Sequence, residues 1–300
     1  MSLMRRLRLW KTVALLAAAC SLLGLTPQAS AAEKRDRAWL VEFVNQPIPE
    51  APRNRRYTEH INRQAEPCFD VDVEWLNTGR GNALEPCRTH LGNLSRLAYA
   101  WRTKGLRYYQ DPAAWAKIER GLLGVARNIQ ADGTFAWGPK LVSHEHAWLV
   151  ESSLLTFLWV REQLPPDQRR VVDEALFRAA QTMVAHPVPS ASNQGSVWCA
   201  VTALASLYYE KPEWLAAANR PADTYMLGGS GNLYDDGEIG EHHQSYKNGG
   251  GPDCNYTYTG LAYIYAYRLW SGRSEIDPPL LKAAHWLVGY HTLSGCGVVP

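Results

Sequence analysis

One polar segment of the sequence is unusually rich in side chains that transfer protons. It reads GEIGEHHQSYKNGGGPDCNYTYTG and spans residues 237–260. Carboxylates, imidazoles and phenols are the groups that enzymes use for general acid–base catalysis. The triple glycine at 249–251 either lets the backbone approach a ligand closely or makes a turn. The candidates in this segment are Glu238, Glu241, His242, His243, Tyr246, Tyr256 and Tyr258.

A second pair of candidates, Asn193 and Gln194, lies at the mouth of an apolar helix. Asn193 would serve as the N-cap of that helix on one interpretation, because a carboxamide oxygen accepts from free backbone N–H groups. On the other, the carboxamide and the positive end of the helix together bind a carboxylate. The sequence leaves both interpretations open.

Two further residues are candidates for contact with a ligand. His146, in SHEHAW, would face a cleft, and Trp137, in TFAWG, would stack on a sugar or pack in the core. Tryptophan and tyrosine, at 12 and 15 residues against 5 phenylalanines, suit packing against sugar rings, although packing between helices explains most of them. SHEHAW lacks the H-E-x-x-H spacing of a zinc protease. The sequence therefore predicts neither a metal site nor a cofactor.

The elements that must position these residues are helices. Helical periodicity recurs along the chain, and no stretch alternates with period two for long enough to build a sheet. Proline-containing cap signals open three of the segments, at Asp111, Pro165 and Asp277. The predicted helices span residues 90–104, 112–131, 144–163, 166–186, 195–210, 256–271 and 278–291.

The pairing of these helices predicts a mainly α protein with an α/α toroid. The pairs are antiparallel, and long connections such as ADGTFAWG (131–138) and YDDGEIGEHH (234–243) lie between helices, whereas the loops of a four-helix bundle are short. We expect the functional loops to gather at one end. The predicted helices are fewer than a complete toroid holds, so we expect residues 90–300 to form an incomplete or truncated barrel of helix pairs.

The N-terminus predicts a secretory signal peptide over residues 1–31. Four basic residues precede an apolar run from Val13 to Leu25, and small residues follow in A-x-A register. A lipoprotein anchor at Cys20 is the alternative, and we expect a secreted or periplasmic protein. The apolar run is too short for a membrane span. Loss of the leader changes the formal net charge from +2 to −2, which argues against a polycation built for nucleic acid.

Residues 32–89 are expected to form a loop-rich lead-in. Cys68 and Cys87 lie close in sequence, and their disulfide would stabilise the fold by about 3 kcal/mol by restricting the unfolded chain. Three later cysteines leave an odd thiol, and no CxxC spacing suggests zinc. The basic residues of the lead-in either meet an anionic polymer or form a solvated arm; they are Arg53, Arg55, Arg56 and Arg63.

Three features in order resemble the catalytic half of the heparinase II/III-like polysaccharide lyases. They are Asn-Gln at a helix start, a helix ending in YYEKPEWL, and then DDGEIGEHHQSY. That family has an α/α toroid followed by a β-sandwich, and in it an Asn, commonly within Asn-His, precedes a Tyr that follows an Asp-Gly…Glu stretch. Here Tyr246 comes 53 positions after Asn193. The resemblance in helical architecture covers residues 90–290, and the resemblance in motif covers residues 192–260. The sequence departs from the family pattern by having Gln194 where a histidine is common and by lacking a β-sandwich.

The resemblance implies β-elimination on a uronic-acid-containing glycan, so that the partner is an anionic polysaccharide. Asn193, with Gln194 and a histidine, would hydrogen-bond the sugar carboxylate and stabilise the enolate-like intermediate, an effect often worth about 3 kcal/mol. Substrate contacts would come from Gln194, Glu241, Tyr256, Tyr258, His146 and Trp137.

The resemblance also implies a tyrosine acid or base. Tyr246 would take the C5 proton or protonate the leaving glycosidic oxygen, and Tyr256 and Tyr258 are its alternatives. A phenol with a pKa of about 10 needs help near neutral pH, which His242 or His243 would supply.

Two other functions stay open. A glycoside hydrolase on the same toroid would use two carboxylates drawn from the 235–241 stretch, but residues on one short loop do not obviously flank a bond. A non-catalytic glycan-binding protein is favoured by Gln194 and by the early end of the chain. The carboxylates of the hydrolase alternative are Asp235, Asp236, Glu238 and Glu241.

Overall fold

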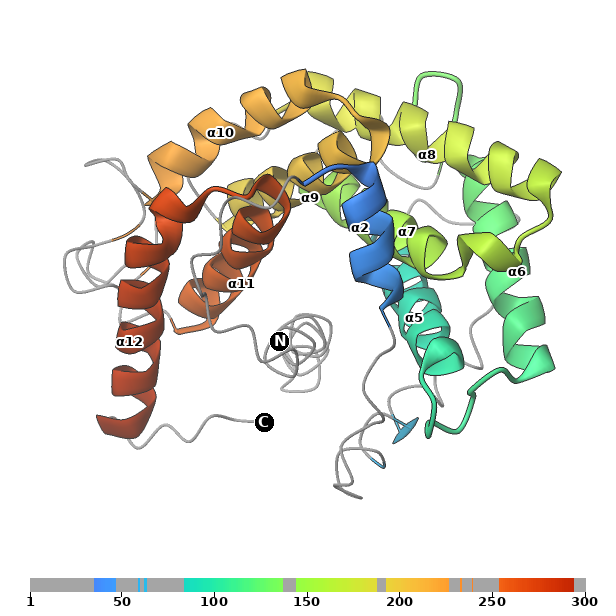
Figure 1. Ribbon diagram of the computed structural model, residues 1–300, viewed down its shortest axis with the longest axis horizontal. Helices are drawn as coiled ribbons and strands as arrows, with labels where there is room; N and C mark the ends of the chain where they lie inside the picture. The colour runs from blue at the N-terminus through green and yellow to red at the C-terminus, as the bar shows by residue number, and fades with distance from the viewer. Residues whose placement is uncertain are drawn as a thin grey trace. The chain divides into compact units, whose positions relative to one another are not determined.

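The chain is mainly α-helical in the computed structural model, which describes residues 35–46, 59, 62–63, 84–136, 144–187, 193–226, 233, 239 and 254–293 (Figure 1). At 84–88, 144, 193, 224–226, 254–258 and 287–293 only the helical backbone is described.

Each of the seven predicted helices is present, with ends moved by a few residues. Two more, α2 and α10, were not predicted. Within the described ranges, β-pairing is limited to two isolated antiparallel bridges, Ile129 with Phe135 and Leu233 with Ile239. The elements are α2 (Arg37–Asn45), α5 (Leu84–Arg102), α6 (Pro112–Asn128), α7 (His144–Val160), the 3₁₀ turn η1 (Arg161–Gln163), α8 (Pro166–Ala185), α9 (Asn193–Tyr209), α10 (Pro212–Met226), α11 (Cys254–Ser271), the 3₁₀ turn η3 (Ser274–Ile276) and α12 (Asp277–Leu293).

The chain divides into two compact units. Unit 2 is continuous and runs from Ala38 to His186, whereas unit 1 combines Met1–Arg37 with Pro187–Pro300. The chain therefore leaves unit 1 after Arg37 and returns to it at Pro187.

Unit 2 contains α5 to α8 and most of α2. α5 packs against α6 and α7, and α8 packs against α6 and α7. Gly121 allows the close approach of α5 and α6, because a Cβ there would lie 2.7 Å from Cδ1 of Leu94. The fully buried core of unit 2 includes Leu91, Leu94, Leu97, Ile118, Leu122, Val125, Leu154, Phe157, Leu158 and Val172.

Unit 1 is built around α9. This helix is buried from Gly195 to Ser206, and it packs against both α10 and α11, while α12 packs on α11. A helix that is apolar on all sides belongs in a core, as α9 does here. The core residues of unit 1 include Trp198, Val201, Leu204, Tyr208, Ala218, Tyr263, Ile264, Tyr267 and Ile276.

The two units repeat one order of elements. Each has two helices, an antiparallel bridge, a third helix, a 3₁₀ turn and a fourth helix: α5, α6, 129–135, α7, η1 and α8 in unit 2, and α9, α10, 233–239, α11, η3 and α12 in unit 1. In both bridges the paired residues are six positions apart.

Short sequence matches accompany this repeat of elements. YYQDP (108–112) and YYEKP (208–212) join the first two helices, and the residue after the tyrosines is left-handed in both, at φ 53° for Gln110 and 55° for Glu210. NIQADGTF (128–135) matches NLYDDGEI (232–239), and LWVREQL (158–164) matches LWSGRSEI (269–276). Matching positions in the two units therefore serve the fold, and residues found in one copy alone are candidates for a specialised role.

Candidate functional site

The N-terminal end of α9 carries the predicted carboxamide. α9 begins at Asn193, Gln194 is half-buried, and Gly195 and Ser196 are buried. The first four backbone N–H groups of a helix have no acceptor within it, and they give this end a partial positive charge. The backbone at Asn193 therefore provides an environment that favours a bound carboxylate.

The two tyrosine candidates of α11 lie in its first two turns. Successive helical residues are about 100° apart, so Tyr256 and Tyr258 occupy nearly opposite faces. Position 256 belongs to the row that continues through Tyr263 and Tyr267, which are buried, whereas position 258 belongs to the row of half-buried Tyr265. The two positions therefore lie on different sides of α11, with position 258 in line with half-buried Tyr265.

Two arginines near the N-terminus fix the relative direction of α9 and α11. Arg35 Nη1 donates to the carbonyl oxygens of Arg268, at 3.1 Å, and Leu269, in the last turn of α11. The Arg37 guanidinium lies 4.6 Å from the ring centroid of Tyr208, in the last turn of α9, and donates to its hydroxyl at 3.3 Å.

This arrangement places the two helix starts at one end of unit 1. Arg35 and Arg37 are two residues apart, so their backbones lie within about 7 Å, while helices of 17 and 18 residues are about 26 Å long. The C-terminal ends of α9 and α11 must therefore be near one another. Because the helices also pack together, they run in the same direction, and Asn193 and the tyrosines of α11 lie toward the same end.

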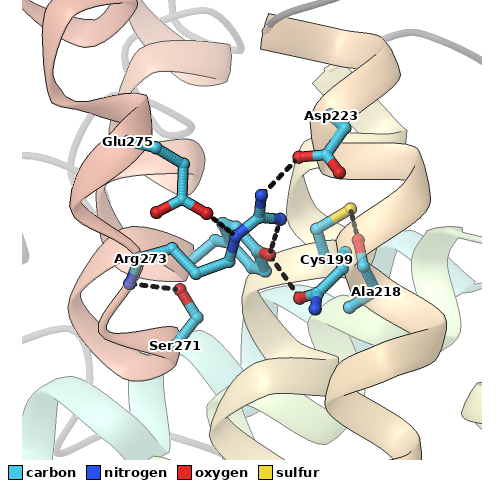
Figure 2. Close-up of polar contacts among 8 residues, drawn as sticks. Cys199, Ala218, Asp223, Ser271, Arg273 and Glu275 are labelled. Atoms are coloured by element: carbon cyan, nitrogen blue, oxygen red, sulfur yellow. Dashed lines mark hydrogen bonds and ion pairs between the residues drawn. The ribbon is translucent and has the colours of Figure 1, made fainter.

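A polar network holds α10 and α11 together (Figure 2). Arg273 lies between Asp223 of α10 and Glu275 of η3: its Nη2 is 2.7 Å from Asp223 Oδ1, and its Nε is 2.6 Å from Glu275 Oε1. Arg273 Nη1 also donates to the Tyr267 hydroxyl at 2.9 Å. The Tyr267 hydroxyl in turn donates to Asn219 Oδ1 at 2.6 Å. The connection from α11 to α12 is thereby tied to α10.

Tyr267 has a structural role in this network, as a protonated hydrogen-bond donor. Burial raises the pKa of Tyr267 to about 12, although the hydrogen bond from Arg273 acts in the opposite direction. The phenol therefore stays protonated near neutral pH and works as a donor to Asn219. Tyr267 is therefore a hydrogen-bond donor and not a base near neutral pH.

His146 is buried in unit 2. Its Nε2 donates to the carbonyl oxygen of Ala179 in α8 at 3.0 Å, and its ring packs edge-on against Phe135 of the 129–135 bridge, with centroids 5.1 Å apart. Burial lowers the pKa of His146, so the ring is neutral near pH 7. The contacts of this predicted substrate-binding residue join α7 to α8 and to the bridge.

The other predicted site residues lie outside the described part of the chain. This holds for His242, His243, Tyr246, Glu241 and Trp137. The pairing of Cys68 with Cys87 also falls there, since only the backbone of Cys87 is described. Their roles remain predictions.

The described residues contain neither a cluster of metal-ligating side chains nor a membrane-spanning helix. No three His, Cys, Asp or Glu side chains in these ranges lie close enough to hold a metal ion. No helix in the same ranges is long and apolar enough to span a membrane.

Sequence reasoning missed the arginines that tie unit 1 together. Arg35 is 233 positions from Arg268, and nothing local marks such a pairing. Arg273 was likewise missed. The repeated LW motif would have located the end of α11, because both of its copies stand in the last turn of a helix, Leu158 and Trp159 in α7 and Leu269 and Trp270 in α11.

The described fold is that of an α/α toroid built from helix pairs, and among the solved structures that resemble it is one that matches most of the chain. This is the X-ray structure of the Streptomyces coelicolor A3 chondroitin AC lyase in complex with chondroitin sulphate, with a TM-score of 0.57 and 16% sequence identity. The match covers 82% of this chain and 34% of that chain, so the chain spans about a third of the length of the lyase.

Sequence comparisons add no relative. No protein-family model matches the chain, and no curated protein matches it. At 16% identity the structural likeness establishes the fold, and the polysaccharide lyase is a distant structural neighbour.

Proposed function

We propose that the chain is a polysaccharide lyase that cleaves a uronic-acid-containing glycan by β-elimination. The observation that supports this most is the common direction of α9 and α11, which brings Asn193 and the start of α11 to one end of unit 1. In the sequence, Tyr246 precedes α11 by eight residues. The likeness to a lyase whose title names chondroitin sulphate supports the reaction class and an anionic substrate.

The first requirement of β-elimination is that the C5 proton of the uronate become acidic. The neighbouring carboxylate opposes this while it keeps its full charge, so the site must share that charge. Asn193 and Gln194, at the positive end of α9, would donate hydrogen bonds to the carboxylate and stabilise the enolate-like intermediate. Such preorganised donors favour the intermediate over the ground state.

The second requirement is proton transfer at C5 and at the leaving oxygen. Tyr246, aided by His242 or His243, would take the C5 proton; the C4–O bond breaks as the C4=C5 double bond forms, and the leaving oxygen receives a proton. The source of that second proton is Tyr246 itself or one of the two histidines. Tyr256 and Tyr258, in the first two turns of α11, are the alternative bases.

An absorbance assay tests the proposal. The elimination product carries a double bond conjugated to its carboxylate and absorbs in the ultraviolet, and hydrolysis creates no such bond. We expect the purified protein to generate this absorbance from at least one polymer in a panel of uronate glycans, chondroitin sulphate included. Substituting Tyr246→Phe should reduce kcat by about 10² to 10⁴, and Asn193→Ala by about 10² to 10³.

A matched control separates chemistry from general damage. Tyr109→Phe makes the same substitution at a tyrosine of unit 2 that is 39% exposed, and it should leave turnover unchanged. New reducing ends without absorbance would replace the proposal with a hydrolase. Binding of a polymer without any product would identify a glycan-binding protein.

The internal repeat weighs against the hydrolase alternative. Asp236 occupies the sequence position that Asp132 holds in NIQADGTF. The Asp132 carboxylate accepts from Thr134 N at 2.9 Å and from Thr134 Oγ1 at 2.7 Å, within its own turn. Glu238 stands where Thr134 does and has no hydroxyl, so only its backbone N–H could make the equivalent bond; a turn-forming Asp236 would leave fewer carboxylates to act as a catalytic pair.

Export to the periplasm or the medium forms part of the proposal. The N-terminal leader predicts cleavage after Ala31, which leaves Arg35 and Arg37 in the mature chain. N-terminal sequencing of the exported protein should begin at Ala32, and an intact leader in that fraction would contradict this.

A further inference from the structure

The N-terminal arginines bind the C-terminal ends of the two helices whose starts carry the proposed lyase residues. Arg35 reaches the last turn of α11 and Arg37 the last turn of α9. We propose that Arg35 and Arg37 are positioning residues of the lyase site, which fix α9 and α11 in register with one another. This inference rests on the proposed function for its catalytic consequence and on contacts within unit 1 for its geometry.

The chemistry of the Arg35 contact suits a helix end. The last four carbonyl groups of a helix have no intrahelical donor, and that end carries a partial negative charge. Arg35 supplies both a donor and a positive charge to the carbonyls of Arg268 and Leu269. Gly272 follows at φ 76°, and a Cβ there would lie 3.3 Å from Arg35 Cδ, so the glycine leaves room for the arginine stem.

The Arg37 contact is of a different kind. Its guanidinium stacks on the ring of Tyr208, which is fully buried, and it also reaches the hydroxyl. A planar guanidinium is suited to both contacts at once, whereas an ammonium is a compact point charge. Because Tyr208 is locked in the core, the position of Arg37 defines the position of the end of α9.

The two contacts act together because they come from neighbouring residues. A short piece of backbone holds both guanidinium groups, so a shift of α9 along α11 would break at least one contact. Helices are stiff, and a change of register at one end moves the other end by a similar amount. The distance between the start of α9 and the start of α11 therefore depends on the arginine pair, and catalysis is sensitive to displacements of about 1 Å.

The test compares Arg35→Ala, Arg37→Ala and the double variant with wild type, and uses Arg102→Ala as the matched control. Arg102 is also a guanidinium on a helix end: it donates to the carbonyls of Val44 and of Gln46, at the end of α2, within unit 2. We expect the double variant to lose at least tenfold in kcat with KM changed less than threefold, and Arg35→Lys to recover part of the loss. Arg102→Ala should retain wild-type kcat at a temperature where it is folded.

Hydrogen exchange provides a readout that needs no activity. In the double variant the amides at the starts of α9 and α11, residues 194–199 and 255–260, should exchange at least tenfold faster than in wild type. A purely local role would accelerate exchange only in the last turns, and that result would overturn the inference. A wild-type protein without ultraviolet product would refute the proposed function alone, since the exchange data would still decide the positioning role.

Discussion

Gly133 offers the sharpest test of the repeated bridge, because its surroundings and its backbone both exclude a side chain. Its φ is 80°, and a Cβ at this position would lie 2.8 Å from the carbonyl carbon of Arg178 and closer still to its oxygen. Gly105 has nearly the same φ, 88°, with no atom within 4 Å of such a Cβ. Gly105→Ala should therefore cost only the left-handed conformation, about 1 to 2 kcal/mol. Gly133→Ala should add an overlap with α8 of about 1 to 3 kcal/mol, for a total of about 2 to 5 kcal/mol.

Urea-induced unfolding followed by far-ultraviolet circular dichroism measures both losses against wild type. The difference between the two variants isolates the overlap, since the backbone term is common to them. Adding Thr182→Ala to Gly133→Ala removes the neighbouring hydroxyl and should not restore stability, because the backbone carbonyl of Arg178 remains in place. Equal unfolding free energies for the Gly105 and Gly133 variants would refute the close docking of this turn on α8.

Three further predictions follow from the contacts of single side chains. Tyr267→Phe removes the hydroxyl that donates to Asn219 and accepts from Arg273, and it should lower the unfolding free energy by about 1 to 2 kcal/mol. The control is Tyr109→Phe at an exposed tyrosine, whose effect should stay within about 0.5 kcal/mol. Burial lowers the pKa of His146 below its unfolded value of about 6.5, so the unfolded chain binds more protons than the folded chain below that pH, and stability should fall on acidification. The substitution His146→Gln should flatten this part of the curve of unfolding free energy against pH. An unchanged slope would contradict the prediction. Cys199 is fully buried, and burial raises the pKa of its thiol, so iodoacetamide should alkylate it only in denaturant. Peptide mapping measures the alkylation. Labelling of the native protein as fast as the unfolded protein would show that the thiol is accessible.

Local sequence signals predicted most of the helices, and the short range of these signals explains the errors. Asp111 accepts from Ala114 N at 2.7 Å with Pro112 at the first helical position, as its cap pattern predicts. Asp277 was predicted as a cap, but it is the first residue of α12 and binds Arg268 at 2.6 and 2.8 Å. A short-range pattern does not reveal a partner on another helix.

The missed helix α10 has two physical causes. YYEKPEWL was interpreted as the end of one helix, but α9 ends at Tyr209, and Glu210 turns the chain with a φ of 55°, which a residue other than glycine seldom adopts. Pro221 then stands inside α10, where proline usually breaks a helix. Packing against α9 compensates for both features, and packing is not visible in local sequence.

Only part of the candidate site was predictable from the sequence, because some of its features are local and others depend on distant contacts. A carboxamide at a helix start is a local feature, and α9 does begin at Asn193. The common direction of α9 and α11 depends on Arg35 and Arg37, which contact residues far along the chain. Such contacts leave no periodic trace in the sequence.

The interruption of unit 1 by unit 2 has a consequence for the order of events during synthesis. Residues 38–186 form a continuous unit, whose whole sequence is synthesised before the second part of unit 1. Arg35 is made early, yet its acceptors on α11 are made 233 residues later, and closing so long a loop carries an entropic cost that an already folded insert would reduce. Unit 2, once folded, would thus shorten the search that completes unit 1.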